Sequence, residues 1–239
     1  QLTDTYNVGI ESSMWNGLLG VELDVFYMKT TRSLESQSAN FPPSLGSYYP
    51  TYINYGSHDN RGFELVLSHN NHIRDFTYHV RGNLSWARNK VLKMTEDANV
   101  PDYKRATGGP MGRYWGFVAD GLFQSEEEIR NYPVNLDGNN NRTLLPGDFI
   151  YKDVNGDGII NGMDERPIGY PEGWAPIMSF GGNIGLQWKG IDLNIDLSGG
   201  AMQGWRQNYE LANAYHGNGN SPVYLLEDRW HRADLYDPD

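Results

Sequence analysis

Six stretches of the sequence alternate apolar and polar residues at every second position. They occupy residues 6–12, 21–27, 61–68, 76–86, 180–188 and 191–197. In "FTYHVRGNLSW", the apolar series is Phe76, Tyr78, Val80, Leu84 and Trp86, and the polar series is Thr77, His79, Arg81, Asn83 and Ser85. Because successive side chains of a strand point to opposite faces, each stretch is predicted to be a β-strand with one apolar and one polar face.

The connections between these strands alternate in length. The short ones at 15–20, 69–75 and 189–190 suit hairpin turns, whereas 31–59, 94–112 and 123–174 are long and polar. Tight turns at one end and long loops at the other are typical of outer-membrane barrels. The predicted fold is therefore all-β: an antiparallel transmembrane β-barrel segment, part of a larger barrel, with long extracellular loops. We expect residues 1–239 to lie in that barrel domain.

One or two short helices are predicted within the loops. "SEEEIRNY" begins with Ser125, a residue type that caps helices, and places acidic residues in the first turn. "SPVYLLEDRWHRAD" begins with Ser221 and has Pro222 at the first helical position.

Composition excludes several classes of protein. With 28 Gly, 16 Tyr and 7 Trp, the chain favours sheets and turns over helical bundles. A net charge of -11 argues against nucleic acid as a partner, and the absence of Cys excludes disulfides and thiolate ligands. No apolar run approaches the roughly 18 residues of a membrane helix. Since the sequence starts at Gln1 and ends on a polar stretch at Asp239, we expect it to be part of a longer protein.

A soluble alternative shares the same alternation. In a β-sandwich, the apolar faces pack against a second sheet instead of lipid. The rival hypothesis is thus a secreted, calcium-stabilised β-sandwich that binds glycans. Strands of about ten residues ending in Trp or Tyr, and loops longer than sandwich corners, favour the barrel. Sequence motifs of common enzymes are absent, although carboxylate pairs for glycan hydrolysis leave a weaker third option.

The stretch 153–164 matches the spacing of an EF-hand calcium loop. The expected ligands are Asp153, Asn155, Asp157, Ile159 through its carbonyl, Asn161 and Asp164, with Gly158 at the sharp turn. Oxygens at every second position of a curled loop converge on one centre and suit calcium. The competing interpretation is a turn held by its own Asx hydrogen bonds.

Several motifs in order resemble the C-terminal part of SusC/RagA-type TonB-dependent transporters. They are "RGFELVLS", "VRGNLSWARNKVLKM", "GRYWGFVADGLFQSEEEI", "GDFIYKDVNGDGIINGMDERPIGYPEG" and "GGNIGLQWKGIDLNIDLSGGAMQ". The resemblance implies a late part of a 22-stranded barrel in the outer membrane of a Gram-negative bacterium. It also implies that 153–164 braces a long extracellular connection within 123–174.

The same resemblance implies partners. Such proteins import oligosaccharides or peptides, with a SusD-like surface lipoprotein as lid and TonB as the energy source. TonB would act through an N-terminal part outside this sequence, together with the plug. The function expected from sequence is thus nutrient uptake by a non-enzymatic transporter.

Four tyrosines in 47–56, namely Tyr48, Tyr49, Tyr52 and Tyr55, are candidate contacts for cargo or partner. The alternative is that they pack among neighbouring loops or form an interfacial girdle. On the polar strand faces, Glu22, Asp24, Glu64, His79 and Arg81 would line the barrel lumen, where they solvate the interior.

Overall fold

The computed structural model describes the chain except residues 37–43, 45–51, 98, 172–174, 228 and 232–239. The chain divides into two compact units, each considered by itself below. The first unit contains residues 1–113 and 170–204, and the second contains residues 114–169 and 205–239.

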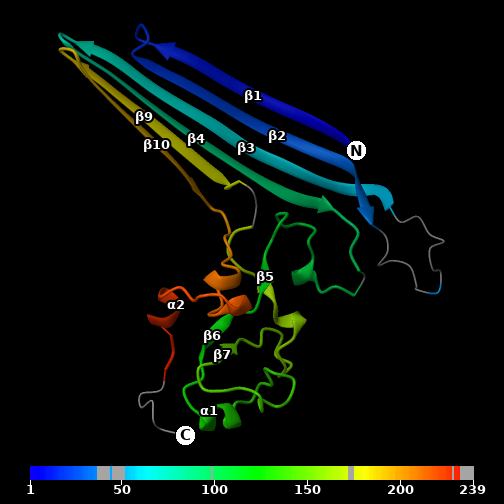
Figure 1. Ribbon diagram of the computed structural model, residues 1–239. Coiled ribbons are helices and arrows are strands. Elements are labelled where there is room, and N and C mark those ends of the chain that lie inside the picture. The colour runs from blue at the N-terminus through cyan, green and yellow to red at the C-terminus, as the bar shows by residue number, and fades with distance from the viewer. Residues whose placement is uncertain (37–43, 45–51, 98, 172–174, 228, 232–239) are drawn as a thin grey trace. The chain divides into compact units, whose positions relative to one another are not determined.

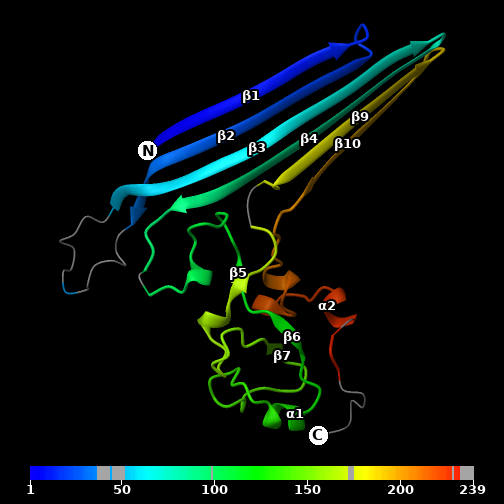
Figure 2. The same ribbon diagram turned by 180° about the vertical axis from the view of Figure 1, so that it is seen from behind.

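The first unit contains a single antiparallel sheet of six strands, in the order β1-β2-β3-β4-β9-β10, and one 3-10 helix, η3 Asp102–Lys104. The strands are β1 Leu2–Met14, β2 Leu19–Ser36, β3 Tyr52–Ile73, β4 Phe76–Lys93, β9 Met178–Trp188 and β10 Ile191–Ala201. They lie side by side in both ribbon views (Figures 1 and 2). All six strands predicted from alternation are therefore confirmed, and each is at least as long as predicted.

Hairpin turns join the strands at one end of the sheet. Lys189 and Gly190 connect β9 to β10 with φ of 47° and 85°, the left-handed conformations that a two-residue hairpin of type I′ requires. The turn between β3 and β4 is also short and contains Arg74 at φ 57°. The predicted turn over 69–75 was too long, because the polar residues from His69 to His72 continue the ladder with β4.

The connection predicted over 31–59 is likewise shorter. β2 continues to Ser36 and β3 begins at Tyr52, and the register between them shifts near Thr31 and Ser33. Arg32 sits at this irregularity with φ 56°. Polar strand ends that extend past the apolar band lack the alternation signal, which is why the sequence pattern ended too early.

The register aligns the apolar residues of all six strands on one face. One row runs Val8, Val25, Phe63, Trp86 and Met178, and the next runs Ile10, Leu23, Leu65, Leu84 and Phe180. Further along, Gly82 of β4 pairs with Gly182 of β9.

This apolar face is open. Val8 is 72% exposed, Leu197 61% and Ile195 41%. Within the described residues of the first unit no second sheet covers it, so the β-sandwich alternative is wrong. A large exposed apolar face on a sheet is instead the surface that a barrel presents to lipid.

Aromatic residues bound this apolar band. Phe76 pairs with Trp188 near the hairpin turns, and Trp86 stacks on Phe63, with ring centroids 6.1 Å apart, toward the other end. From Phe76 to Trp86 the strand rises about 33 Å at about 3.3 Å per residue. With a strand tilt of about 40°, the band is about 25 Å tall, which matches the apolar belt of outer-membrane barrels.

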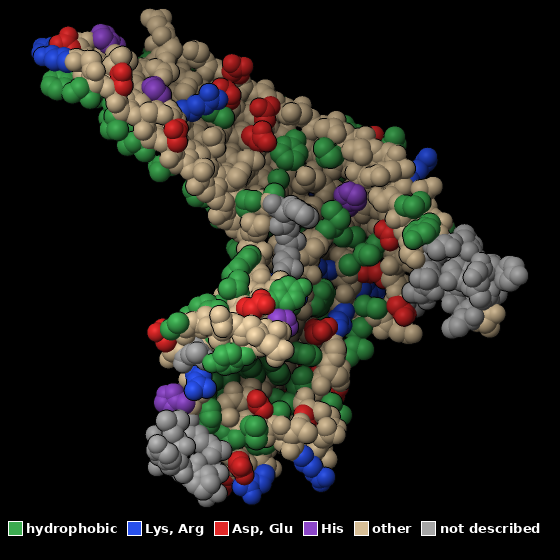
Figure 3. All heavy atoms as spheres, in the orientation of Figure 1, with side chains coloured by type: hydrophobic (Ala, Val, Ile, Leu, Met, Phe, Trp, Pro, Cys, Tyr) green, Lys and Arg blue, Asp and Glu red, His purple; other side chains and the backbone are tan. Residues whose placement is uncertain are grey.

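The opposite face of the sheet is polar. Figure 3 shows acidic, basic and histidine side chains distributed over the sheet face turned to the viewer. Glu22, Asp24, Glu64, His79 and Arg81 all belong to this face by register, as predicted. The two faces thus suit lipid on one side and water on the other.

The second unit contains short elements around a small core. They are β5 Trp115–Gly116, β6 Ala119–Leu122, α1 Glu126–Asn131, β7 Phe149–Tyr151, η4 Gly162–Asp164, β8 Arg166–Pro167, η5 Tyr209–Leu211, η6 His216–Asn218 and α2 Tyr224–Glu227. Strand β5 pairs with β8, and β6 with β7. Phe123 is fully buried and meets Tyr132 edge-on at 5.2 Å between ring centroids.

Both predicted helices are present. Ser125 caps α1 by accepting a hydrogen bond from the Glu128 N–H at 3.2 Å, as its sequence pattern predicts. Helix α2 begins at Tyr224, so Pro222 is not its first helical residue. Among the described residues, none of the helices has the length and apolar character needed to cross a membrane.

Candidate functional site

A hydrogen-bonded network lies on the polar face across β4, β9 and β10. His79 Nε2 is 2.6 Å from Asn183 Oδ1, and the Asn183 amide donates to Asp196 Oδ1 at 2.6 Å and to Asn194 Oδ1 at 3.0 Å. Asn194 in turn donates to Asp196 Oδ2 at 3.0 Å. The network is solvent-exposed, so it holds polar side chains in fixed positions on the wall without burying charge.

Glycine makes room for this network. Gly185 pairs with His79 across β4 and β9, and a Cβ there would lie 1.9 Å from the imidazole ring. The ring can lie over the β9 backbone only because position 185 lacks a side chain. Beside it, a shallow groove of about 330 Å³ is lined by Thr77, His79, Gly185, Leu186, Gln187, Asp192, Leu193 and Asn194. Its polar lining can form hydrogen bonds with a solute or with another segment in the lumen.

Charged residues continue along the same face. Arg81 Nη2 lies 3.9 Å from Glu22 Oε1, with both side chains at least half exposed. Asp24 and Glu64 are direct cross-strand neighbours, and two like charges in this position are tolerated only in water. These contacts indicate a hydrated surface rather than a catalytic centre.

The loop 153–164 in the second unit is held by its own side chains. Asp153 accepts hydrogen bonds from the Gly156 and Gly158 N–H groups at 2.7 and 2.8 Å. Asn155 accepts from Asp157 N at 3.0 Å, and Asp157 accepts from Ile159 N at 2.9 Å. These Asx turns produce the curled backbone that the sequence spacing predicts.

Asp164 closes the loop from its centre. The side chain is fully buried and accepts from the N–H groups of Val154, Asn155 and Asn161 at 3.0, 3.4 and 2.9 Å. Burial alone would raise the pKa of this carboxyl. The three backbone donors and the nearby Arg166 charge outweigh burial and hold the pKa below its ordinary value.

Asn161 completes the closure as a helix cap. It accepts from Met163 N at 2.8 Å and forms a capping box with Asp164 at the start of η4. A parallel bridge between Asn135 and Ile159, with Asn135 N donating to Gly158 O at 2.8 Å, ties the loop to a neighbouring segment.

These contacts bear on the calcium expected at the loop. Among the residues described, no three His, Asp or Glu side chains gather closely enough to hold one metal ion. The oxygens of Asp153, Asp157 and Asp164 instead receive backbone N–H groups. Hydrogen bonds within the loop therefore account for its shape, and calcium at this loop stays a prediction.

The tyrosine candidates are only partly within the described structure. Tyr48 and Tyr49 lie outside the described residues. Tyr52 and Tyr55 are not in a loop, because they belong to the start of β3, where Tyr52 pairs with Ser36 of β2. The Lys93 ammonium lies over the Tyr55 ring, 3.8 Å from its centroid, in a cation–π contact. Tyr52 is 60% exposed.

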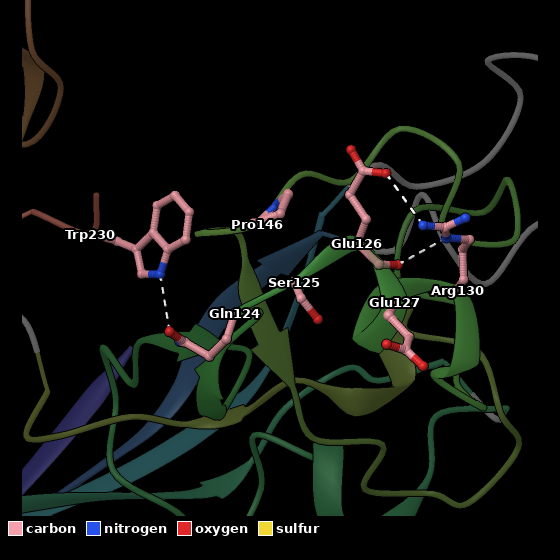
Figure 4. A pocket seen from close by; sticks show the side chains of 7 residues that line it. All are labelled: Gln124, Ser125, Glu126, Glu127, Arg130, Pro146 and Trp230. Atoms are coloured by element: carbon pink, nitrogen blue, oxygen red, sulfur yellow. Dashed lines mark hydrogen bonds and ion pairs between the residues drawn. The ribbon is translucent and has the colours of Figure 1, made fainter. Parts of the chain in front are cut away.

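A cavity of about 450 Å³ in the second unit was missed by sequence reasoning (Figure 4). Its lining consists of Gln124, Ser125, Glu126, Glu127, Arg130, Pro146 and Trp230. The Trp230 indole donates to Gln124 Oε1 at 3.2 Å and lies against Gly147, where φ is 99° and a Cβ would be 2.8 Å from the ring. An aromatic face beside charged and amide groups is a lining that small polar ligands use. Because Trp230 is distant in sequence, no local signal could have revealed the cavity.

Comparison with known proteins decides the family. The profile of the family described as "TonB dependent receptor-like, beta-barrel" matches residues 1–157. The chain belongs to this family.

Curated relatives agree with this membership. The TonB-dependent receptor chain is 26% identical to TonB-dependent receptor P3 of Formosa agariphila, over 92% of this chain and 22% of that protein. It is 26% identical to TonB-dependent receptor SusC of Bacteroides thetaiotaomicron, over 69% of this chain and 18% of that protein. The chain thus spans about a fifth of the length of these relatives.

Solved structures share the fold. The RagAB peptide importer in its open-open state aligns with a TM-score of 0.60 at 18% identity, over 84% of this chain and 20% of that one. Another structure, of the RagAB peptide transporter, gives a TM-score of 0.55 at 19% identity, over 82% of this chain and 20% of that one. The sheet is therefore part of a TonB-dependent receptor barrel, in the outer membrane of a Gram-negative bacterium. It is similar in sequence to SusC and shares the fold of the RagAB structures. The family is one of transporters, not enzymes.

Proposed function

We propose that the chain forms part of the wall of an outer-membrane transporter that imports peptides or oligosaccharides. The observation that carries the proposal is the two-faced sheet. Its apolar face has the height of an outer-membrane belt, and its other face presents the fixed polar network of His79, Asn183 and Asp196. A solute or a plug segment in the lumen would meet this polar face.

The partners are a SusD-like surface lipoprotein and TonB. Similarity to SusC and to the RagAB peptide transporter supports this part of the proposal. In this arrangement the long connection between β4 and β9, which contains 123–174, lies outside the cell and faces the lipoprotein. Among the described residues of the second unit, those that line the cavity beside Trp230 have a chemistry that suits a peptide or a glycan.

Within that connection, the loop at 153–164 serves as a brace. The hydrogen bonds on Asp153 and Asp164 support this role with or without a metal. Calcium bound there would stabilise the loop further in proportion to its concentration.

The test has two parts, both on the full-length receptor. A deletion strain is grown on peptides or on oligosaccharides as the limiting nutrient, and tagged receptor is isolated to see which lipoprotein accompanies it. Growth unchanged on every nutrient, with no lipoprotein recovered, would contradict the proposal. Orientation is tested with Asn139→Cys in the second unit, which an impermeant maleimide should label on intact cells.

A further inference from the structure

Four basic side chains lie on the apolar face of the sheet, just beyond its aromatic row. Arg61 is two residues before Phe63, and Arg88 is two residues after Trp86, so both arginine side chains point to the same face as these two aromatic rings. Lys29 and Lys90 occupy the next row out. Lys29, Arg61, Arg88 and Lys90 are called the basic array below.

Arg61 and Arg88 are directly opposite each other in the register of β3 and β4. Like charges in this position repel, and water screens the pair less on the lipid-facing side than it screens Asp24 and Glu64 on the polar face, so an anion between the two guanidiniums would stabilise them. Both are exposed, and within the described part of the chain neither guanidinium takes part in an ion pair. Tyr27, across from Arg61 on β2, places a hydroxyl-bearing ring in the same row.

The acidic residues nearby do not neutralise the array. Asp59 pairs in register with Lys29 on one side and Lys90 on the other, yet neither lysine forms an ion pair with it in the described structure. Asp59 is only 4% exposed, and its Oδ1 has no hydrogen-bond partner. Asp4 lies at the edge of the same row as Asp59. The four residues of the basic array, together with Asp59 and Asp4, therefore carry a net charge of +2.

The height of the array on the wall matches the lipid headgroups. Two residues beyond the row of Phe63 and Trp86 correspond to about 7 Å along the strand and about 5 Å along the membrane normal at ordinary barrel tilt. The array is at the end of the sheet that bears the long connections, which outer-membrane barrels place outside the cell. Basic residues at this level attract anionic headgroups.

We propose that the basic array binds phosphate groups of an anionic lipid in the outer leaflet. A phosphate between Arg61 and Arg88 would accept paired hydrogen bonds from each planar guanidinium and relieve their repulsion. Lys29 and Lys90 would supply further positive charge from the row above. The inference rests on the orientation that belongs to the proposed function, and it needs no assumption about the cargo.

The experiment uses the full-length receptor, delipidated in mild detergent and titrated with lipid A while native mass spectrometry counts bound molecules. Arg61→Gln combined with Arg88→Gln should weaken binding about tenfold or more, because each guanidinium loses the charge-assisted hydrogen bonds that it would form with a phosphate. Arg61→Lys with Arg88→Lys keeps the charge but loses the fork, so a smaller loss is expected. The control, Arg81→Gln with Lys189→Gln, removes the same charge elsewhere and should bind as the unaltered receptor does.

Dephosphorylated lipid A should bind weakly to every form. Equal binding by the Gln pair, or equal loss in the control pair, would overturn the proposal. If inorganic phosphate at millimolar concentration displaces lipid A fully, the array is a site for free phosphate and the lipid assignment is wrong. Should the Gln pair fail to fold, an unchanged affinity of the Lys pair would be decisive against the proposal. Failed labelling of Asn139→Cys on intact cells would instead contradict the orientation in the proposed function.

Discussion

A charge placed on the apolar face should cost free energy according to its depth in the membrane. Strand β10 runs from Ile191 to Ala201, and Leu197 is one residue from its middle. One residue of a tilted strand corresponds to about 2.6 Å of depth. Leu197→Arg, close to the midplane, should therefore lower the free energy of unfolding by about 2–4 kcal/mol.

The same strand supplies graded comparisons. Leu193 is three residues from the middle of β10 and thus about 8 Å from the midplane. Leu193→Arg should cost about 1–2 kcal/mol, and Ile191→Arg, in the outermost row, about 0–1 kcal/mol. Since Leu197, Leu193 and Ile191 are 61%, 51% and 65% exposed, loss of packing contributes little to these differences.

The assay is urea unfolding of the full-length receptor in phospholipid vesicles, followed by tryptophan fluorescence. Ser198→Arg, on the polar face next to Leu197, is the matched control and should be close to neutral. A flat profile across the three positions, or a cost for Ser198→Arg as large as for Leu197→Arg, would refute the assignment of the two faces.

Four further predictions concern the second unit. Asp164→Ala should destabilise its loop by about 2–4 kcal/mol, since three N–H groups lose a buried acceptor; hydrogen exchange at Val154 measures this. Because the pKa of Asp164 is lowered on folding, its stabilisation is complete above about pH 5 and lost as pH falls below about 4, visible in proteolysis of the loop against pH. Asp157→Ala should abolish any calcium-dependent rise in melting temperature; an equal rise in the variant would exclude the loop as the site. Ser125→Ala should cost α1 about 1 kcal/mol through loss of its cap, whereas Ser125→Asp should preserve it.

Sequence patterns predicted the wall better than the loops. Alternation located all six strands because lipid on one face and water on the other impose opposite demands on neighbouring residues such as Ile195 and Asp196. The pattern disappears where both faces are wet, so alternation does not reveal the outer ends of β2 and β3, which include Tyr52 and Tyr55.

In the second unit, local motifs could be predicted from the sequence, whereas contacts between distant segments could not. The cap at Ser125 and the curl of 153–164 follow from side chains that bond their own backbone neighbours. The full burial of Asp164 and the contact of Trp230 with Gln124 depend on segments that folding brings together. The spacing of residues in the sequence does not predict which distant segments meet. The basic array was also missed, because Arg61 and Arg88 become neighbours only through the register of β3 and β4.

That register has a consequence for how such a wall assembles. If β9 paired with β4 one residue out of step, its side chains would exchange faces, and Asn183 and Gln187 would enter hydrocarbon while Ile184 and Leu186 turned to water. Each misplaced amide would meet a solvent that offers it no hydrogen bond. The bilayer therefore destabilises hairpins that pair in the wrong register. Lipid and water around the sheet favour the correct register as much as contacts between the strands do.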